Sequence, residues 1–254
     1  IGSISVNAAV IDDDKKVLEN RYEYCYGKPF DVLMRVLDEI IVAYGFDSIG
    51  TIAFTGSGGK QAAELAGGAF VNEIIAQSTS VSVLYPHIRT IIEMGGEDSK
   101  LIFMENGSTT AFSRLSDFAM NSLCAAGTGS FLDQQANRIE VPIEVEFGNL
   151  ALKSENPPRI AGRCSVFAKS DMIHLQQIAT PLHDIVAGLC FAVARNFKST
   201  LGRGKKFEKP FIFQGGVAAN AGMVRAFREI FELTDNELLI PEYHASMGAL
   251  GAIF

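Results

Sequence analysis

Residues 120–139 combine a thiol, a tight glycine turn and the start of a predicted helix. Cys124 stands ahead of Gly127-Thr128-Gly129, and apolar side chains recur at helical spacing after the turn. A thiolate ahead of a helix start lies near the positive end of the backbone dipole. The exposed amides of the glycine turn can bind an anion such as a phosphate. The segment therefore offers a metal ligand and a phosphate-binding turn a few residues apart.

Three carboxylates gather on one predicted strand and the turn that follows it. They are Glu93, Glu97 and Asp98, with Lys100 close by. Such a group can hold Mg²⁺ through water and can orient the water that attacks a phosphoryl group. An acidic, solvated turn is the alternative, and the neighbouring Gly95-Gly96 favours the functional interpretation.

Five glycine turns lie where a predicted strand enters a turn or a turn enters a helix. They are Gly2-Ser3, Gly56-Ser-Gly-Gly59, Gly95-Gly96, Gly127-Thr128-Gly129 and Gly215-Gly216. A residue without a Cβ lets backbone amides approach a charged ligand closely. A single turn of this kind is more often a plain tight turn, but five in phase with the strands favour a nucleotide site.

The elements that must position these residues occur in two rounds along the chain. The first round predicts a hairpin over 5–24, a helix over 29–45, a buried strand over 48–55 and another helix over 71–84. The second round predicts strands over 88–94, 100–104, 109–115 and 211–213, and helices that include 146–153, 181–202 and 223–231. This layout predicts a duplicated α/β fold with glycine turns facing one cleft, at the carboxyl ends of the strands.

We expect two lobes around that cleft. Residues 1–86 form the first lobe, the C-terminal residues 241–254 return to it, and residues 87–240 form the second lobe. The chain starts at Ile1 without a Met and stops inside a predicted helix, so we expect it to be one domain of a longer polypeptide.

Composition excludes several classes of protein. The net charge of −7 argues against a general nucleic-acid binder. No apolar run approaches about 18 residues, so a membrane span is not expected. No secretory signal is visible and the four cysteines are widely separated, which favours a reducing, cytoplasmic setting.

The glycine turns resemble those of the actin, hexokinase and heat-shock-chaperone superfamily of ATPases. Ile1-Gly-Ser3 is similar to its first phosphate loop and Glu93-Met-Gly-Gly-Glu-Asp98 to its second. Gln214-Gly-Gly-Val-Ala-Ala-Asn220 resembles its adenosine motif, and Ala245-Ser-Met-Gly248-Ala-Leu-Gly251 its closing connector. The resemblance implies a ribonuclease-H-like fold in which two loops clasp ATP or ADP with Mg²⁺, and the nucleotide closes the cleft.

The two cysteine segments make this resemblance more specific. Residues 124–133 and 164–171 resemble the signature segments of the 2-hydroxyacyl-CoA dehydratase activators and the related benzoyl-CoA reductase ATPase subunits, and the resemblance covers the whole chain. It implies a homodimer in which Cys124 and Cys164 of each subunit bind one shared [4Fe-4S] cluster. ATP hydrolysis would drive one low-potential electron into a dehydratase or reductase, with reduced ferredoxin or flavodoxin as the donor.

The cysteine count agrees with a shared cluster. A four-thiolate cluster needs four ligands, so a pair per chain is half a site that a two-fold dimer completes. Cys25, in the predicted hairpin, and Cys190, on an apolar helix face, are interpreted as small buried hydrophobic residues. Two unconnected structural cysteines at 124 and 164 remain the alternative.

The predicted site has three sets of residues. The catalytic set is Glu93, Glu97 and Asp98, and the cluster ligands are Cys124 and Cys164. The nucleotide-binding set is Gly2, Ser3, Gly56, Gly95, Gly96, Lys100, Gly127, Thr128, Gly129, Gly215, Gly216, Asn220 and Gly248. Asn220 could instead cap the helix that follows it.

The phosphate loops depart from the family pattern at several positions. Ile4, Asn7, Ser57, Gly59, Glu93 and Glu97 are examples, whereas both cluster cysteines are retained. Nucleotide binding is therefore expected more firmly than hydrolysis. Two alternatives stay open: a nucleotide-binding interaction domain without turnover, and a small-molecule kinase with Asp98 as the base. A kinase would not need Cys124 or Cys164.

Overall fold

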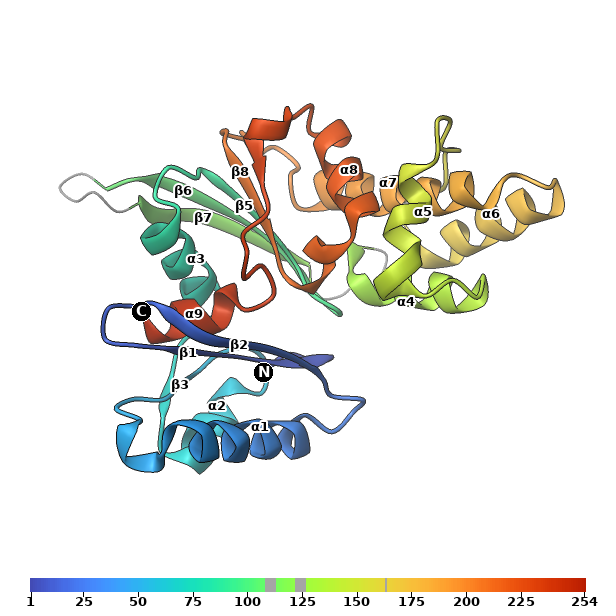
Figure 1. Cartoon of the computed structure of the whole chain (residues 1–254). Coiled ribbons are helices and arrows are strands. Elements are labelled where there is room, and N and C mark those ends of the chain that lie inside the picture. The colour runs from blue at the N-terminus through green and yellow to red at the C-terminus, as the bar shows by residue number, and fades with distance from the viewer. Residues whose placement is uncertain (108–112, 122–126, 163) are drawn as a thin grey trace. The chain divides into compact units, whose positions relative to one another are not determined.

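The computed structural model describes residues 1–107, 113–121, 127–162 and 164–254, and the chain divides into two compact units (Figure 1). The first unit consists of residues 1–88, 104–116 and 245–254, and the second of 89–103 and 117–244. The chain therefore passes from one unit to the other after residues 88, 103, 116 and 244.

The first unit begins with the predicted hairpin. β1 (Ser5–Ile11) and β2 (Val17–Tyr24) pair antiparallel, from Ser5 opposite Tyr24 to Ile11 opposite Val17. Asp12 holds the turn, because its Oδ1 accepts hydrogen bonds from the backbone N–H groups of Asp14 and Lys16 at 3.1 and 2.9 Å. The hairpin prediction is confirmed.

Helix α1 (Pro29–Tyr44) follows, with proline in its first turn, where a missing N–H costs nothing. It buries Leu33, Val36 and Ile40, which lie on one face at helical spacing. Leu33 belongs to a small core that also contains Val6 of β1 and Cys25.

The middle of the first unit differs from the prediction. The strand predicted over 48–55 is replaced by a short 3₁₀ turn, η1 (Phe46–Ser48), and a two-residue strand, β3 (Ala53–Phe54). The structure adds α2 (Gly59–Ala66) and β4 (Ala69–Phe70), which pairs parallel with β3. Neither was predicted, because the glycines before α2 indicate a turn and its eight residues are too few to show a clear apolar period.

Two helices complete the first unit. The side chain of Asn72 accepts a hydrogen bond from the N–H of Ile74 and so caps α3 (Glu73–Leu84). α9 (Met247–Ile253) packs against α3 so closely that a Cβ on Gly251 would lie 1.7 Å from the carbonyl oxygen of Ala76. Glycine is required there by the approach of two backbones.

The larger sheet has the strand order β7-β6-β5-β8-β9. Its strands are β5 (Thr90–Met94), β6 (Ser99–Asn106), β7 (Ser113–Asn121), β8 (Phe211–Gln214) and β9 (Leu238–Leu239). β5 pairs antiparallel with β6 and parallel with β8, and β8 pairs parallel with β9. β6 and β7 each pass from one unit to the other along their length.

The second unit contains several helices. They are α4 (Gly129–Arg138), the short π-helix η3 (Ile143–Phe147), α5 (Gly148–Leu152), α6 (Ser165–Gln177), α7 (Leu182–Thr200) and α8 (Ala221–Ile230). α5, α6 and α8 all pack against α7. In the core, the ring of Phe227 lies edge-on to Phe197 and Phe213, with centroids 5.3 and 4.8 Å apart. Within the described residues, no helix is long and apolar enough to cross a bilayer.

Candidate nucleotide and cysteine site

The turn after β5 is hydrogen-bonded to the start of α4. The N–H of Gly129 donates to the carbonyl of Gly95 at 3.0 Å, and that of Ser130 to the carbonyl of Gly96 at 2.8 Å. A Cβ on Gly129 would lie 3.0 Å from the oxygen of Gly95 and 2.8 Å from Val217. Glycine is therefore needed for this close approach. The amide of Gly129 thus donates to Gly95 within the protein, and anion binding by the amides of this glycine turn stays a prediction.

The turn after β8 lies against the end of β5. Gly215 has a φ of +92°, and a Cβ there would lie 2.3 Å from the carbonyl oxygen of Met94 and 2.9 Å from Oε1 of Glu93. Gly216 opens the 3₁₀ turn η4 (Gly216–Ala219), which contains the Val217 that contacts Gly129. Three of the predicted glycine turns thus meet at one place in the second unit.

The carboxylates and Lys100 form a largely buried ion cluster. Lys100, with 1% of its surface exposed, lies opposite the buried Glu93 in the β5–β6 ladder. Its Nζ lies 2.9 Å from Oε2 of Glu93 and 2.9 Å from Oδ1 of Asp98. Glu97 is exposed beside them. The ammonium group thus forms ion pairs with two carboxylates, and a role of Lys100 as a nucleotide contact stays a prediction.

Gly127, three residues after Cys124, and Gly162, two residues before Cys164, pack on the same turn of α7. A Cβ on Gly127 would lie 3.3 Å from Nδ2 of Asn196, and a Cβ on Gly162 would lie 2.7 Å from the carbonyl oxygen of Ala192. Thr128, between Gly127 and α4, is fully buried. Cys124 itself lies outside the described residues.

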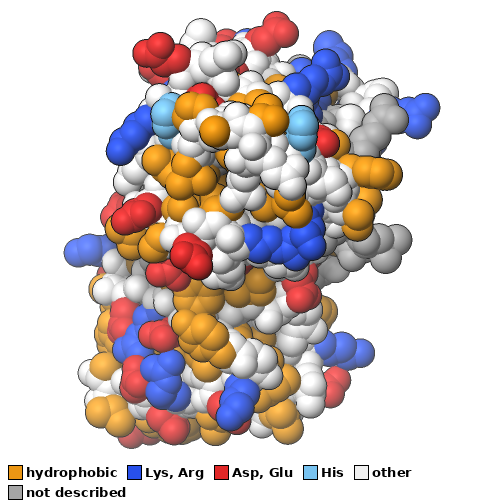
Figure 2. Space-filling model, turned by 90° about the vertical axis from the view of Figure 1, so that its right-hand side faces the viewer, with side chains coloured by type: hydrophobic (Ala, Val, Ile, Leu, Met, Phe, Trp, Pro, Cys, Tyr) orange, Lys and Arg blue, Asp and Glu red, His pale blue; other side chains and the backbone are white. Residues whose placement is uncertain are grey.

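Cys164 occupies the N-cap position of α6 in extended backbone conformation and is half-buried. α6 buries Ala168 and Met172 and exposes Val166 and Phe167, the latter to 65%. Figure 2 looks onto the side of the molecule where α6 lies in Figure 1, and it shows several groups of hydrophobic side chains on that face. Cys164 therefore stands at the edge of an apolar, solvent-facing helix.

The other described cysteines behave differently from Cys164. Cys25 and Cys190 are buried in the cores of the first and second units. Burial raises the pKa of the Cys25 thiol and raises the pKa of Cys190 to about 12. A thiol that stays protonated is a poor metal ligand. The interpretation of both as small buried hydrophobic residues is confirmed.

In the first unit, the first loop lies beside the Gly56 turn. The carbonyl of Ile1 accepts from the N–H of Gly58 at 3.2 Å, and the N–H of Gly2 donates to the carbonyl of Ser5 at 2.9 Å. Gly56 has a φ of +84°, and a Cβ there would lie 2.5 Å from the oxygen of Ile1. Ser3 is exposed in this loop.

Two predicted contacts have a structural explanation. Asn220 caps α8, since its Oδ1 accepts from the N–H of Met223 at 3.1 Å, as the capping interpretation proposed. Gly248 lies on α9, where a Cβ would be 3.1 Å from Nε2 of Gln77 on α3. Both residues therefore serve packing or capping within their own unit.

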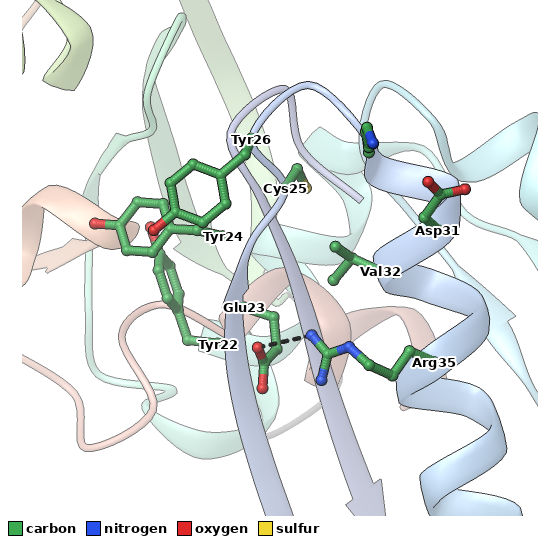
Figure 3. A pocket seen from close by; sticks show the side chains of 9 residues that line it. Tyr22, Glu23, Tyr24, Cys25, Tyr26, Asp31, Val32 and Arg35 are labelled. Carbon is green, nitrogen blue, oxygen red and sulfur yellow. Dashed lines mark hydrogen bonds and ion pairs between the residues drawn. The ribbon is translucent and has the colours of Figure 1, made fainter.

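A separate pocket of about 580 Å³ lies in the first unit, along the end of β2, its turn and α1. Figure 3 shows the rings of Tyr22, Tyr24 and Tyr26 on one side of β2 and the Glu23–Arg35 ion pair on the side of α1. Tyr26 is 89% exposed and has a φ of +46°, an uncommon backbone conformation for a bulky residue. The pocket is lined by none of the predicted site residues.

His244 is not among the predicted site residues, yet it is hydrogen-bonded to the Gly215 turn. Its carbonyl accepts from the N–H of Gly215 at 2.7 Å, and its Nδ1 lies 3.0 Å from the carbonyl oxygen of Gly215. A lone histidine without metal-ligand spacing gives no sequence signal for such a contact.

Comparison with known proteins defines the class first. The fold is the duplicated α/β fold of the actin-type ATPases. An activator of 2-hydroxyisocaproyl-CoA dehydratase from Clostridium difficile, solved with bound ADPNP, matches with a TM-score of 0.87 and 30% identity over 99% of this chain and 90% of that one. Component A of (R)-2-hydroxyglutaryl-CoA dehydratase from Acidaminococcus fermentans matches with a TM-score of 0.89 and 28% identity, covering 99% and 93%.

The family follows from the sequence match. The model of the BadF/BadG/BcrA/BcrD ATPase family matches residues 1–252, so the chain belongs to that family. The 2-hydroxyisocaproyl-CoA dehydratase activator of Clostridioides difficile is 39% identical over 72% of this chain and 65% of its own length. The activating ATPase of A. fermentans (R)-2-hydroxyglutaryl-CoA dehydratase is 34% identical over 70% and 66%. The chain thus spans slightly less than two thirds of these relatives. The predicted fold class and family are confirmed.

Proposed function

We propose that the protein is an ATP-dependent activator that passes a low-potential electron from a [4Fe-4S] cluster, shared by two copies of the chain, to a partner enzyme. The partner would be a 2-hydroxyacyl-CoA dehydratase or a related reductase, and the donor reduced ferredoxin or flavodoxin. Family membership supports this proposal, as do relatives described as dehydratase activators, one of them solved with ADPNP.

One observation carries the proposal: the link between the Gly95–Gly96 turn and the first two residues of α4. That turn resembles a phosphate loop, and α4 begins five residues after Cys124. If nucleotide binding shifts this turn, α4, the helix that follows Cys124, must move with it, or the two backbone hydrogen bonds must break. This connection would let a nucleotide change the surroundings of a cluster, in the sense of a population shift between two arrangements.

The described residues fit a cluster that bridges two copies. Cys164 is half-buried, so its sulfur can reach a shared centre, and it stands at the positive end of the 13-residue helix α6. Gly127 and Gly162, each within three residues of Cys124 or Cys164, pack on one turn of α7. The exposed Val166 and Phe167 offer apolar surface that a second copy would cover. When bound, such a cluster supplies a single electron at low potential.

The nucleotide is proposed to lie at the glycine turns. In the second unit the proposed contacts are Gly95, Gly96, Gly215 and Gly216. In the first unit they are Gly2, Ser3 and Gly56. Asp98 and Glu97 are proposed to hold Mg²⁺ through water, and Glu93 to help orient the attacking water. Lys100 fixes Glu93 and Asp98 in place through its two ion pairs.

The test is anaerobic purification followed by iron and sulfide analysis. We expect about four iron atoms per two chains. Cys164→Ser should lose them, because the ligand set is broken. Cys25→Ala, a buried cysteine of the other unit, should keep them. Iron-free wild-type protein that binds nucleotide normally would contradict the electron-transfer proposal.

A nucleotide-binding domain without turnover is the second candidate. It is favoured by the ion cluster, because Lys100 already binds the carboxylates that would otherwise serve the metal and water. Single-turnover hydrolysis of ATP separates the two candidates. Phosphate release at a rate above that of a Lys100→Met, Asp98→Asn double variant supports the ATPase, and tight binding without release supports the second candidate.

A further inference from the structure

The ladder between β8 and β9 ends early. Phe211 pairs with Leu238 and Ile212 with Leu239. Continuing this register would place Pro241 beside Gln214, and a proline has no N–H to donate to a ladder. The chain instead turns, with the N–H of His244 donating to the carbonyl of Pro241 at 3.1 Å.

Beyond the end of the β8–β9 ladder, His244 supplies the hydrogen bonds to Gly215. Its carbonyl accepts from the N–H of Gly215 at 2.7 Å, while Nδ1 of its ring lies 3.0 Å from the carbonyl of the same glycine. The tautomer protonated at Nδ1 donates this second bond. One residue thus satisfies both backbone groups of Gly215, whose other side is pressed against Met94 and Glu93.

His244 is also the last residue of the second unit. The chain enters the first unit at Ala245, whose carbonyl accepts a hydrogen bond from Nδ2 of Asn7 on β1 at 2.9 Å. The chain therefore crosses between the units at the bond between residues 244 and 245, and each of these two residues is hydrogen-bonded within its own unit. His244 is bound to the glycine turn of the second unit, and Ala245 to the strand that follows the first loop in the first unit.

We propose that His244 is a positioning residue for the nucleotide site, which fixes Gly215 at the tip of β8 and ties that turn to the crossover at 244–245. The inference rests on the proposed nucleotide role of Gly215 and Gly216. Gly215 needs this support because glycine adopts positive and negative φ with similar ease, so its φ of +92° is not fixed by the residue itself. Loss of the imidazole removes one of two hydrogen bonds to the Gly215 carbonyl, which keeps the bond from the N–H of Ala218 at 3.2 Å, and so loosens the turn.

The decisive pair of variants is His244→Ala and His244→Asn. The side-chain nitrogen of asparagine stands as many bonds from Cα as Nδ1 of histidine, so Asn can remake the hydrogen bond to Gly215. Alanine cannot. His87→Ala is the matched control, since His87 is an exposed histidine away from the site.

Two readouts are compared in these variants: hydrogen exchange of the Gly215 amide in nucleotide-free protein, and the Kd for ATP with Mg²⁺ by calorimetry. We expect His244→Ala to speed the exchange and to raise the Kd about three- to tenfold, as for the loss of one hydrogen bond. His244→Asn should restore both to within about twofold, and His87→Ala should change neither.

The outcomes separate the inference from the function on which it rests. Unchanged exchange and unchanged Kd in His244→Ala, with a wild type that binds ATP, overturn the positioning role alone. A wild type that binds no nucleotide overturns the proposed function, and the inference with it. Loss of binding in both variants, without rescue by asparagine, also contradicts a role through the Nδ1 hydrogen bond.

Discussion

Two helices of the second unit that pack against each other, α6 and α7, differ in the burial of their cysteines. α7 buries residues along most of its 19-residue length, with Cys190 among them. α6, 13 residues long, buries Ala168 and Met172 and presents Cys164 at its exposed end beside Val166 and Phe167. Packing explains the residues of α7. The exposed apolar residues of α6 are not explained by packing within its own unit, and we propose that a second copy of the chain covers them.

The largest expected difference is in thiol reactivity. A pKa of about 12 leaves roughly one Cys190 thiol in ten thousand ionised at pH 8, and its rate of alkylation should rise with pH. We expect Cys164 of iron-free, folded protein to react at least ~100-fold faster than Cys190. Mass spectrometry of iodoacetamide-treated peptides measures both. Equal rates in the folded protein would remove the contrast.

Core packing on α7 gives the next largest effect. Phe197 is fully buried against Phe227, so Phe197→Ala should lower the free energy of unfolding by about 3–5 kcal/mol. Urea denaturation followed by circular dichroism measures the change. A loss below about 1 kcal/mol would mean that α7 is not the packed centre of the second unit.

The hydrogen-bonded link between the Gly95–Gly96 turn and α4 should be disturbed by adding one methyl group to Gly129. Gly129→Ala places a Cβ within 3.0 Å of the Gly95 oxygen, so we expect a loss of about 1–3 kcal/mol and weaker ATP binding. Gly50→Ala is the control, because nothing lies within 4 Å of the added carbon. Thermal unfolding and calorimetry measure the two effects. An unchanged Kd in Gly129→Ala would break the proposed link.

The smallest effect on stability belongs to α6. Phe167→Ala removes an exposed side chain and should change the free energy of unfolding of the single chain by less than about 0.5 kcal/mol. It should nevertheless weaken self-association, which sedimentation velocity measures in the iron-loaded protein. If the variant and the wild type associate equally, Phe167 does not belong to the interface.

The sequence predicted elements whose apolar period is clear. The hairpin, α1 and α8 are examples, since Leu33, Val36 and Ile40 recur at helical spacing over 16 residues. It failed where elements are short, as in α2 and β4, and it ended the return strand at residue 115, whereas β7 continues to Asn121. Phe118 and Met120 alternate with less apolar residues there, but they face outward and therefore do not indicate a core strand.

The site divides in the same way. The glycine turns, the carboxylates and the cysteine segments could be predicted from the sequence, because their residue types imply chemistry. Their hydrogen-bond partners could not be predicted, because the hydrogen bonds between Gly129 and Gly95 and between His244 and Gly215 join residues far apart in the chain. Local sequence shows that a glycine can come close to a backbone, and the fold determines which backbone that is.

The central claim is that the Gly95–Gly96 turn is coupled to α4 and α6, the helices that follow Cys124 and Cys164. The most direct test of this claim measures the rate at which a chelator removes iron from the protein. Bathophenanthroline is added under anaerobic conditions with and without saturating Mg²⁺ and a non-hydrolysable ATP analogue. The link from Gly95–Gly96 to α4 predicts a clear change in the rate in the wild type and a smaller one in Gly129→Ala. Identical rates with and without bound nucleotide would contradict the coupling.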